Sequence, residues 1–352
     1  MPDQKITLRL PAEWEPQDAV QLTFPHADSD WADMLDAVLP VFVQLAETIS
    51  RFETVLIVCR DEDATKKLLA GANPANLRFA EIPSNDTWAR DHGGIVVEEN
   101  GRPVVLDFVF NGWGLKFPAD KDNRITRALW DAGFFNAEHR YPGLALEGGG
   151  IESDGQGTLL TTAECLLSPN RNPHLSKAQT EATLKELFGL DRVLWLHHGY
   201  LAGDDTDSHI DTLARFCSPD TIAYIRCADP ADEHFEALQA MEAELKTFQT
   251  AVGKPYNLVP LPWPEACFAE DGHRLPATYA NFLIINGAVL VPTYGVPQDA
   301  EALRVLAPVF PGREIIGIDC RILIEQHGSL HCVTMQYPEG SFRGNSSYDL
   351  KS

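Results

Sequence analysis

The thiol of Cys332, near the C-terminus, is the side chain with the greatest potential for covalent chemistry. It lies in the segment Gly328–Pro338, whose pattern predicts a short strand entered from a glycine loop. A thiolate is a strong nucleophile when a neighbour lowers the pKa of the thiol or removes its proton. A free cysteine in an apolar strand is more often an inert small hydrophobe. The segment alone therefore favours a core residue.

Two glycine-rich segments add polar groups that a reactive thiol could use. The stretch Asn85–Gly94 combines an aromatic residue, carboxylates and two glycines before a predicted strand, a combination found in functional loops. The alternative is a solvated loop in which Asp86 caps a turn. Glu147 precedes three glycines, Gly148–Gly150, which allow close approach to a ligand or to another segment. A bulge or a tight corner is equally compatible with this pattern.

An acidic segment, Gly203–Thr212, contains a histidine two residues before an aspartate. If Ser208–Leu213 is extended, His209 and Asp211 point to the same face. An imidazole beside a carboxylate is an arrangement for general acid–base catalysis. The segment lacks the glycine and final glutamate of an EF-hand, and His-x-Asp alone supplies too few zinc ligands. A solvated or calcium-like acidic loop is the alternative.

Together these segments contain a nucleophile, a base and several carboxylates, without an obvious set of metal ligands. Carboxylates pair well with a guanidinium group, which is planar and always charged. A guanidine carbon held between two carboxylates would be open to attack by a thiolate from one face. The combination indicates chemistry on a guanidinium compound.

The composition limits the partners of the chain. It has 352 residues, 44% hydrophobic and 22% charged, with 28 basic and 51 acidic residues and a net charge of −23. Such an acidic protein is a poor partner for nucleic acid and for anionic membranes. The start lacks a long apolar segment, so no secretory signal is expected, and no apolar run is long enough to span a bilayer. Seven cysteines without a Cys-x-x-Cys pair predict neither a disulfide framework nor a zinc ribbon, and favour the cytoplasm.

The elements that must position these residues alternate along the chain. Periodicity and capping residues predict helices at 36–52, 61–70, 122–132, 176–188, 231–250 (the longest) and 298–306. Predicted strands are 54–59, 94–99, 103–110, 157–162, 193–196, 222–226, 282–291, 314–318 and 330–335. Asn100-Gly101 and Asn286-Gly287 are expected to be hairpin turns. The alternation predicts an α/β fold of similar units without a fixed sequence repeat. No nucleotide-binding glycine motif follows a strand.

Several motifs occur in a fixed order between about residues 12 and 338. They are Trp88-Ala89-Arg90-Asp91, Glu147-Gly148-Gly149, 157–162 with Asn170-Arg171-Asn172-Pro173, His209-Ile210-Asp211, Ala280-Asn281-Phe282 and His331-Cys332. This ordered set resembles the agmatine deiminase / bacterial-type peptidylarginine deiminase family of guanidine-modifying enzymes. The resemblance implies a five-bladed pseudosymmetric α/β propeller, formed by residues 1–352 as one domain around an acidic pocket. Residues 341–352 are expected to form a loosely held tail.

The resemblance also implies hydrolytic deimination without a metal or organic cofactor. Cys332 matches the nucleophile, His209 the acid/base and Glu147 the carboxylate beside it. Asp91 and Asp211 match the carboxylates that clamp the guanidinium.

Two more positions match residues that surround the substrate. Trp88 matches an aromatic wall, and Asp205 falls where the family has an acidic residue four before the histidine. The sequence departs from common family patterns at Ser208, at 150–152 and at 334–337. These departures leave the reacting groups in place and concern the identity of the substrate's tail.

The expected partner is a small cationic guanidine, and nucleic acid and membranes are not expected partners. Agmatine is the first candidate, with N-carbamoylputrescine and ammonia as products in polyamine synthesis. Deimination of free or peptidyl arginine to citrulline, amidino transfer to an amine, and guanidine binding without catalysis are alternatives. The oligomeric state is left open, with a homo-oligomer among the possibilities.

Overall fold

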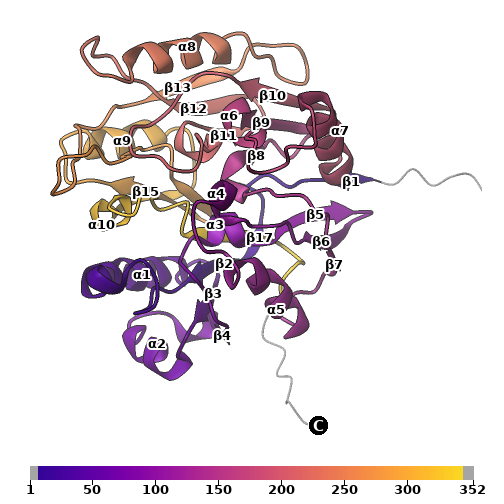
Figure 1. Ribbon diagram of the computed structural model, residues 1–352, viewed down its shortest axis with the longest axis vertical. Coiled ribbons are helices and arrows are strands. Elements are labelled where there is room, and N and C mark those ends of the chain that lie inside the picture. Colours follow the sequence, from indigo (N-terminus) through magenta and orange to yellow (C-terminus); the bar gives the residue numbers. More distant parts are fainter. Residues whose placement is uncertain (1–6, 344–352) are drawn as a thin grey trace, which may run out of the picture.

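The computed structural model describes residues 7–343. Its described residues form five small β-sheets arranged around the centre of the molecule (Figure 1). Four sheets contain an antiparallel hairpin whose second strand pairs in parallel with a later strand. They are β5 (Ile95–Glu99), β6 (Arg102–Leu106) and β7 (Glu138–Arg140); β8 (Ile151–Ser153), β9 (Thr158–Thr162) and β10 (Arg192–Leu196); β11 (Ala214–Ser218), β12 (Thr221–Ile225) and β13 (Asn257–Leu261); and β14 (Leu283–Ile285), β15 (Ala288–Thr293) and β16 (Glu314–Asp319).

The fifth sheet follows the same pattern but joins the two ends of the chain. Its antiparallel pair is β17 (Thr334–Pro338) with β2 (Gln17–Thr23), and its parallel strands are β3 (Thr54–Cys59) and β4 (Leu77–Glu81). The first strand, β1 (Leu8–Arg9), pairs with β5 of the next sheet. The α/β class is confirmed, and the described residues form five sheets, the number of blades that the resemblance implies.

Helices connect the parallel strands or lie between the sheets. The longer ones are α1 (Leu35–Ile49), α2 (Glu62–Leu68), α5 (Ile125–Asp131), α7 (Lys177–Phe188), α8 (Phe235–Leu245) and α9 (Asp299–Leu306). The short ones are α3 (Ala89–His92), α4 (Gly112–Leu115), α6 (Ala163–Leu166) and α10 (Arg321–Ile324), with 3-10 turns at η1 (Ala32–Met34), η2 (Pro74–Asn76), η3 (Asp122–Arg124), η4 (Gly148–Gly150) and η5 (Ile210–Thr212). Among the described residues, no helix has the length and apolar character needed to cross a membrane.

Local signals in the sequence position many of these elements correctly. Asn100 and Gly101 both have positive φ, as a tight hairpin turn between β5 and β6 requires. Ser176 and Gln179 form the predicted capping box of α7, and Gly189 ends this helix in the left-handed conformation.

Two predictions about the ends of elements are wrong. The predicted helix 231–250 shortens to α8, which has 11 residues against 15 in α1, because turns at 229–235 precede it. Asp232 holds these turns through hydrogen bonds from Trp263 and Arg274. The loosely held tail does not begin at Ser341, because this residue and Phe342 are buried. The remaining tail residues, 344–352, lie outside the described part of the chain.

Candidate active site

Four short segments, each leading into a strand of a different sheet, meet at the centre of the molecule. They are α3, η4, η5 and the turn that leads into β17, and the contacts run from β17 to α3, from α3 to η4 and from η4 to η5. Figure 1 shows α3 in the middle of the sheets. The three polar clusters and the cysteine identified in the sequence are therefore brought together.

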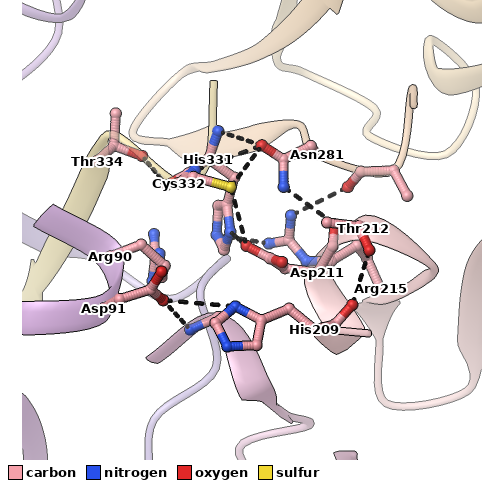
Figure 2. Close-up of polar contacts among 12 residues, drawn as sticks. Arg90, Asp91, His209, Asp211, Thr212, Arg215, Asn281, His331, Cys332 and Thr334 are labelled. Atoms are coloured by element: carbon pink, nitrogen blue, oxygen red, sulfur yellow. Dashed lines mark hydrogen bonds and ion pairs between the residues drawn. The ribbon is translucent and has the colours of Figure 1, made fainter. Parts of the chain in front are cut away.

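Cys332 lies in a turn, and the prediction that it belongs to a strand is wrong. The backbone N–H groups of His331 and Cys332 donate to Asn281 Oδ1 at 2.8 and 3.4 Å, so neither is free for sheet pairing. The thiol is 3.4 Å from Asn281 Oδ1 and 4.0 Å from Asp211 Oδ2 (Figure 2). Burial and the Asp211 and Asp91 carboxylates raise the pKa of Cys332 well above its ordinary value. Without a cation beside it, the sulfur is held as a thiol.

Asp91 and Asp211 supply two buried carboxylates beside this thiol. Asp91 accepts hydrogen bonds from Gly149 N at 3.0 Å and Trp113 Nε1 at 2.9 Å, and burial raises its pKa to about 6. Asp211 Oδ2 is 2.7 Å from His331 Nδ1, and Asp211 Oδ1 has no hydrogen-bond partner within the described chain. Burial opposes the charge of Asp211, but the bond to His331 lowers its pKa overall.

His209 is fully buried, and neither of its ring nitrogens has a hydrogen-bond partner among the described residues. Its Nδ1 is 3.6 Å from Asp91 Oδ1, and its Nε2 is 4.0 Å from Glu147 Oε2. Burial opposes protonation, but Asp91, Cys165 and Glu147 together raise the pKa of His209 well above its ordinary value. The ring is therefore held ready to donate a proton. Glu147 is in turn fixed by Arg171, whose Nε donates to both carboxylate oxygens at 3.0 and 2.8 Å.

His209 and Asp211 do not lie on an extended segment, so the condition under which the sequence places them on one face is not met. Ser208 N donates to Asp204 Oδ2 at 2.8 Å, and His209 N donates to Thr206 Oγ1 at 3.1 Å. These side-chain acceptors replace a strand partner and begin the 3-10 turn η5. The turn still brings both functional side chains to the same place.

Gly149 is the point at which the three side chains converge. A Cβ atom there would be 2.6 Å from His209 Nδ1, 2.8 Å from Asp91 Oδ1 and 3.2 Å from Asp211 Oδ2. A Cβ atom at the neighbouring Gly148 would be 2.3 Å from the carbonyl oxygen of Arg90. The glycines after Glu147 thus permit close approach, as one reading of the sequence predicts.

A narrow cavity that is open to solvent reaches Cys332. Of the predicted residues, Trp88, Asp91, Asp205 and Cys332 line it, whereas His209, Glu147 and Asp211 are not among its lining residues. The other lining residues are Asp30, Asp86, Trp113, Phe117, Thr206, Gln326, His327 and Gly328. Burial raises the pKa of Asp86 to about 6 and also raises that of Asp205. The described lining contains several carboxylates and no lysine or arginine.

Sequence reasoning assigned no role to several residues that build this site. Trp113 has a positive φ of 54° and bonds Asp91, and the only local signal for it is its position between Gly112 and Gly114. In the sequence, Arg171 appears only as a member of the motif Asn170–Pro173, without an assigned role. Its role could not be inferred because Glu147 is 24 residues away in the sequence.

One group of potential metal ligands overlaps with the site. Atoms of Glu147, Cys165 and His209 lie within 4.8 Å of one another. Arg171 places its guanidinium against both oxygens of Glu147. A cation at this position would face that positive charge, so the group fits an acid–base role better than a metal centre.

Comparison with known proteins gives a consistent result. The model of the Porphyromonas-type peptidyl-arginine deiminase family matches residues 9–338. An agmatine deiminase of Stutzerimonas stutzeri is 34% identical over 352 residues, covering 94% of this chain and 95% of that protein. An agmatine deiminase of Pseudomonas aeruginosa has the same identity and coverage.

Solved structures share the whole fold. A C. jejuni agmatine deiminase with substrate bound has a TM-score of 0.90 and 39% identity, over 98% of this chain and 99% of that chain. A Porphyromonas gingivalis protein provisionally described as an arginine deiminase has a TM-score of 0.91 and 56% identity, over 96% of this chain and 100% of that chain.

Proposed function

Because the chain belongs to the Porphyromonas-type peptidyl-arginine deiminase family, we propose that it hydrolyses agmatine to N-carbamoylputrescine and ammonia. The reaction proceeds through a covalent amidino-cysteine on Cys332. The substrate-bound C. jejuni agmatine deiminase, with its TM-score of 0.90, supports this choice.

The charge of the cavity is the observation that carries the choice of substrate. Asp30, Asp86 and Asp205 line it above the reacting groups, and no lysine or arginine is present among its described lining residues. Agmatine presents an amine at the end opposite its guanidinium, and carboxylates attract that amine. The carboxylate of arginine would instead be repelled by these acidic side chains.

Substrate binding activates the nucleophile. The guanidinium lies between Asp91 and the unpartnered Oδ1 of Asp211, which both accept its N–H groups. Its positive charge partly offsets the two carboxylates that raise the pKa of Cys332, so the thiol loses its proton to solvent and the thiolate forms. The thiolate attacks the guanidine carbon and forms a C–S bond.

His209 then acts as acid and afterwards as base. It donates its proton to the leaving nitrogen, the C–N bond breaks, and an amidino-cysteine remains. Glu147, held by Arg171, favours the charged imidazole before this step. Neutral His209 next accepts a proton from water, the hydroxide attacks the amidino carbon, and the C–S bond breaks. The Cys332 thiolate leaves, and the new hydroxyl group loses its proton to give the ureido product. The released ammonia takes up a proton in solution, so ammonium accounts for the positive charge of the substrate.

A substrate panel tests this proposal. Agmatine, arginine and arginyl peptides are each incubated with the enzyme, and ammonia and ureido products are measured. We expect ammonia from agmatine and at least 100-fold less from the others. Cys332→Ser should release none, while mass spectrometry of the wild-type protein during turnover should detect an amidino adduct on Cys332.

Arginine deimination is the second candidate, favoured by the 56% identity to the P. gingivalis protein and by the description of the family. Citrulline formation in the same panel, with agmatine left intact, would establish this candidate and overturn the first. Binding of agmatine without any ammonia release would instead indicate a guanidine-binding protein that lacks catalysis.

The state of the cysteines indicates the cellular compartment of the protein. All seven cysteines are unpaired, and six of them are buried. We therefore place the protein in a reducing compartment, the cytoplasm.

A further inference from the structure

The residue before the nucleophile, His331, occupies a buried network that the proposed reaction does not use. Its Nδ1 is 2.7 Å from Asp211 Oδ2, and its Nε2 is 2.8 Å from Glu13 Oε2 and 3.0 Å from Arg215 Nη2. Figure 2 shows the His331 ring behind Cys332, directed toward Asp211 and Arg215. The ring thus joins Asp211, one of the two carboxylates proposed to hold the substrate, to a second group of charges, the pair Glu13 and Arg215.

That second pair is itself firmly held. Arg215 Nη2 donates to Glu13 Oε2 at 2.8 Å, and Arg215 Nε contacts Glu152. Glu13 Oε1 accepts the backbone N–H of Ile284 at 2.7 Å. Arg215 is fully buried, and Glu13 is nearly so. The His331 ring, which contacts both members of this pair, therefore has little freedom to rotate.

The bond to Asp211 does not depend on the charge of the imidazole. An ionised Asp211 can only accept, so His331 Nδ1 must carry the proton. When the ring is neutral, its Nε2 accepts from Arg215. When the ring is charged, its Nε2 donates to Glu13. In both states Nδ1–H remains on Asp211 Oδ2.

We propose that His331 is a positioning residue, which holds Asp211 so that its unpartnered oxygen, Oδ1, faces the guanidinium of the substrate. Asp211 also lies 4.0 Å from the sulfur of Cys332, so its orientation sets the place of the guanidine carbon relative to the nucleophile. This inference rests on the proposed function, because it assigns a role in binding that guanidinium.

Two substitutions of His331 separate positioning from packing. The side-chain nitrogen of asparagine can occupy the place of Nδ1, and that of glutamine the place of Nε2. Both substitutions remove the ring, but only His331→Asn keeps a donor for Asp211. Each is combined with Cys332→Ser, and agmatine affinity is measured by calorimetry. His139→Gln, at a buried histidine–aspartate pair outside the site with an Nε2–Oδ2 distance of 2.8 Å, is the control.

We expect His331→Gln to weaken agmatine binding about 10- to 100-fold, as for a lost hydrogen bond to a charged group, and His331→Asn to restore most of this loss. With Cys332 intact, KM should follow the same order, and the pH profile of the Asn variant should keep the wild-type shape. Equal affinities of the Asn and Gln variants would overturn the positioning role. If the Cys332→Ser protein alone fails to bind agmatine, the proposed function itself is wrong.

Discussion

The electrostatic environment of Cys332 makes its reactivity depend on the charge of the substrate. Its thiol sits beside two carboxylates, which raise its pKa when the cavity holds no cation. A guanidinium between Asp91 and Asp211 offsets part of this negative charge and so lowers the pKa of the thiol. The nucleophile is therefore activated by the same contact that recognises the substrate, which protects the thiol from reacting with neutral electrophiles in its absence.

The convergence on Gly149 predicts a large effect of a small substitution. Gly149→Ala would place a methyl group 2.6 Å from His209 Nδ1 and 2.8 Å from Asp91 Oδ1, so both side chains must move. We expect kcat/KM for agmatine to fall on the order of 100-fold, as for misplaced catalytic groups. Gly317→Ala, in β16, is the control, and its activity should stay near that of the wild type. A fully active Gly149→Ala enzyme would contradict the geometry of the site.

The pKa of Asp91 predicts an acid limit of activity. This carboxylate has a pKa of about 6 instead of 3.8, so it becomes neutral as the pH falls through 6 and loses its hold on the guanidinium. We expect kcat/KM to decline below about pH 6. Because the folded state holds this proton more tightly than the unfolded state, the contribution of Asp91 to stability grows as the pH falls from 6 toward 4.

Kinetics and thermal melts over the same pH range test both halves of this prediction. Activity should fall between pH 7 and 5 without a matching loss of folded protein. Constant kcat/KM down to pH 5 would show that Asp91 need not be ionised.

At the scale of elements, the capping box of α7 predicts a stability effect that leaves chemistry unchanged. Ser176 Oγ accepts the Gln179 N–H, and Gln179 bonds back to the Ser176 N–H. Ser176→Ala should lower the free energy of unfolding by about 1 kcal/mol. Chemical denaturation measures this loss, and Ser176→Thr should retain most of the cap. A change of kcat/KM in Ser176→Ala would mean that α7 influences the site.

The capping box, the Asn-Gly hairpin and the buried run of β3 were predictable because their causes lie within a few residues of sequence. The errors arise where distant groups supply the hydrogen bonds. Asn281, some 50 residues before Cys332, takes the N–H groups that a strand would use. The segment at His209 is a different case, because its bend comes from Asp204 and Thr206, only three or four residues from the N–H groups that they accept. The residues predicted from the ordered motifs nevertheless lie close together in the structure, because that prediction did not depend on local conformation.

At the scale of the whole molecule, the pairing of the two ends of the described chain fixes the position of the nucleophile. The fifth sheet is completed only when β17 pairs with β2, in the register Thr334 with Leu22 and Gln336 with Val20. Cys332 precedes β17 by two residues, so the pairing of β17 with β2 also positions the thiol beside the carboxylates that lie between the other sheets. No local pattern in the sequence reveals a pairing between the two ends of the chain.

The net charge of −23 predicts that salt weakens substrate capture. Agmatine is a dication, and its attraction to the acidic cavity is screened as the Debye length shrinks from roughly 20 Å to about 4 Å between about 0.02 and 0.5 M salt. We expect KM for agmatine to rise several-fold over this range while kcat stays constant, because the buried contacts at Asp91 and Asp211 are screened much less.

Two variants that each remove one negative charge distinguish attraction by the cavity from attraction by the protein surface as a whole. Asp205→Asn removes a carboxylate of the cavity, whereas Asp131→Asn removes an exposed one on α5, paired with Arg127. If the cavity provides the attraction, only Asp205→Asn should raise KM at low salt and flatten its dependence on ionic strength. Equal effects of both variants would assign the attraction to the total charge of the protein. The acidic cavity would then no longer explain the preference for a substrate with two positive ends.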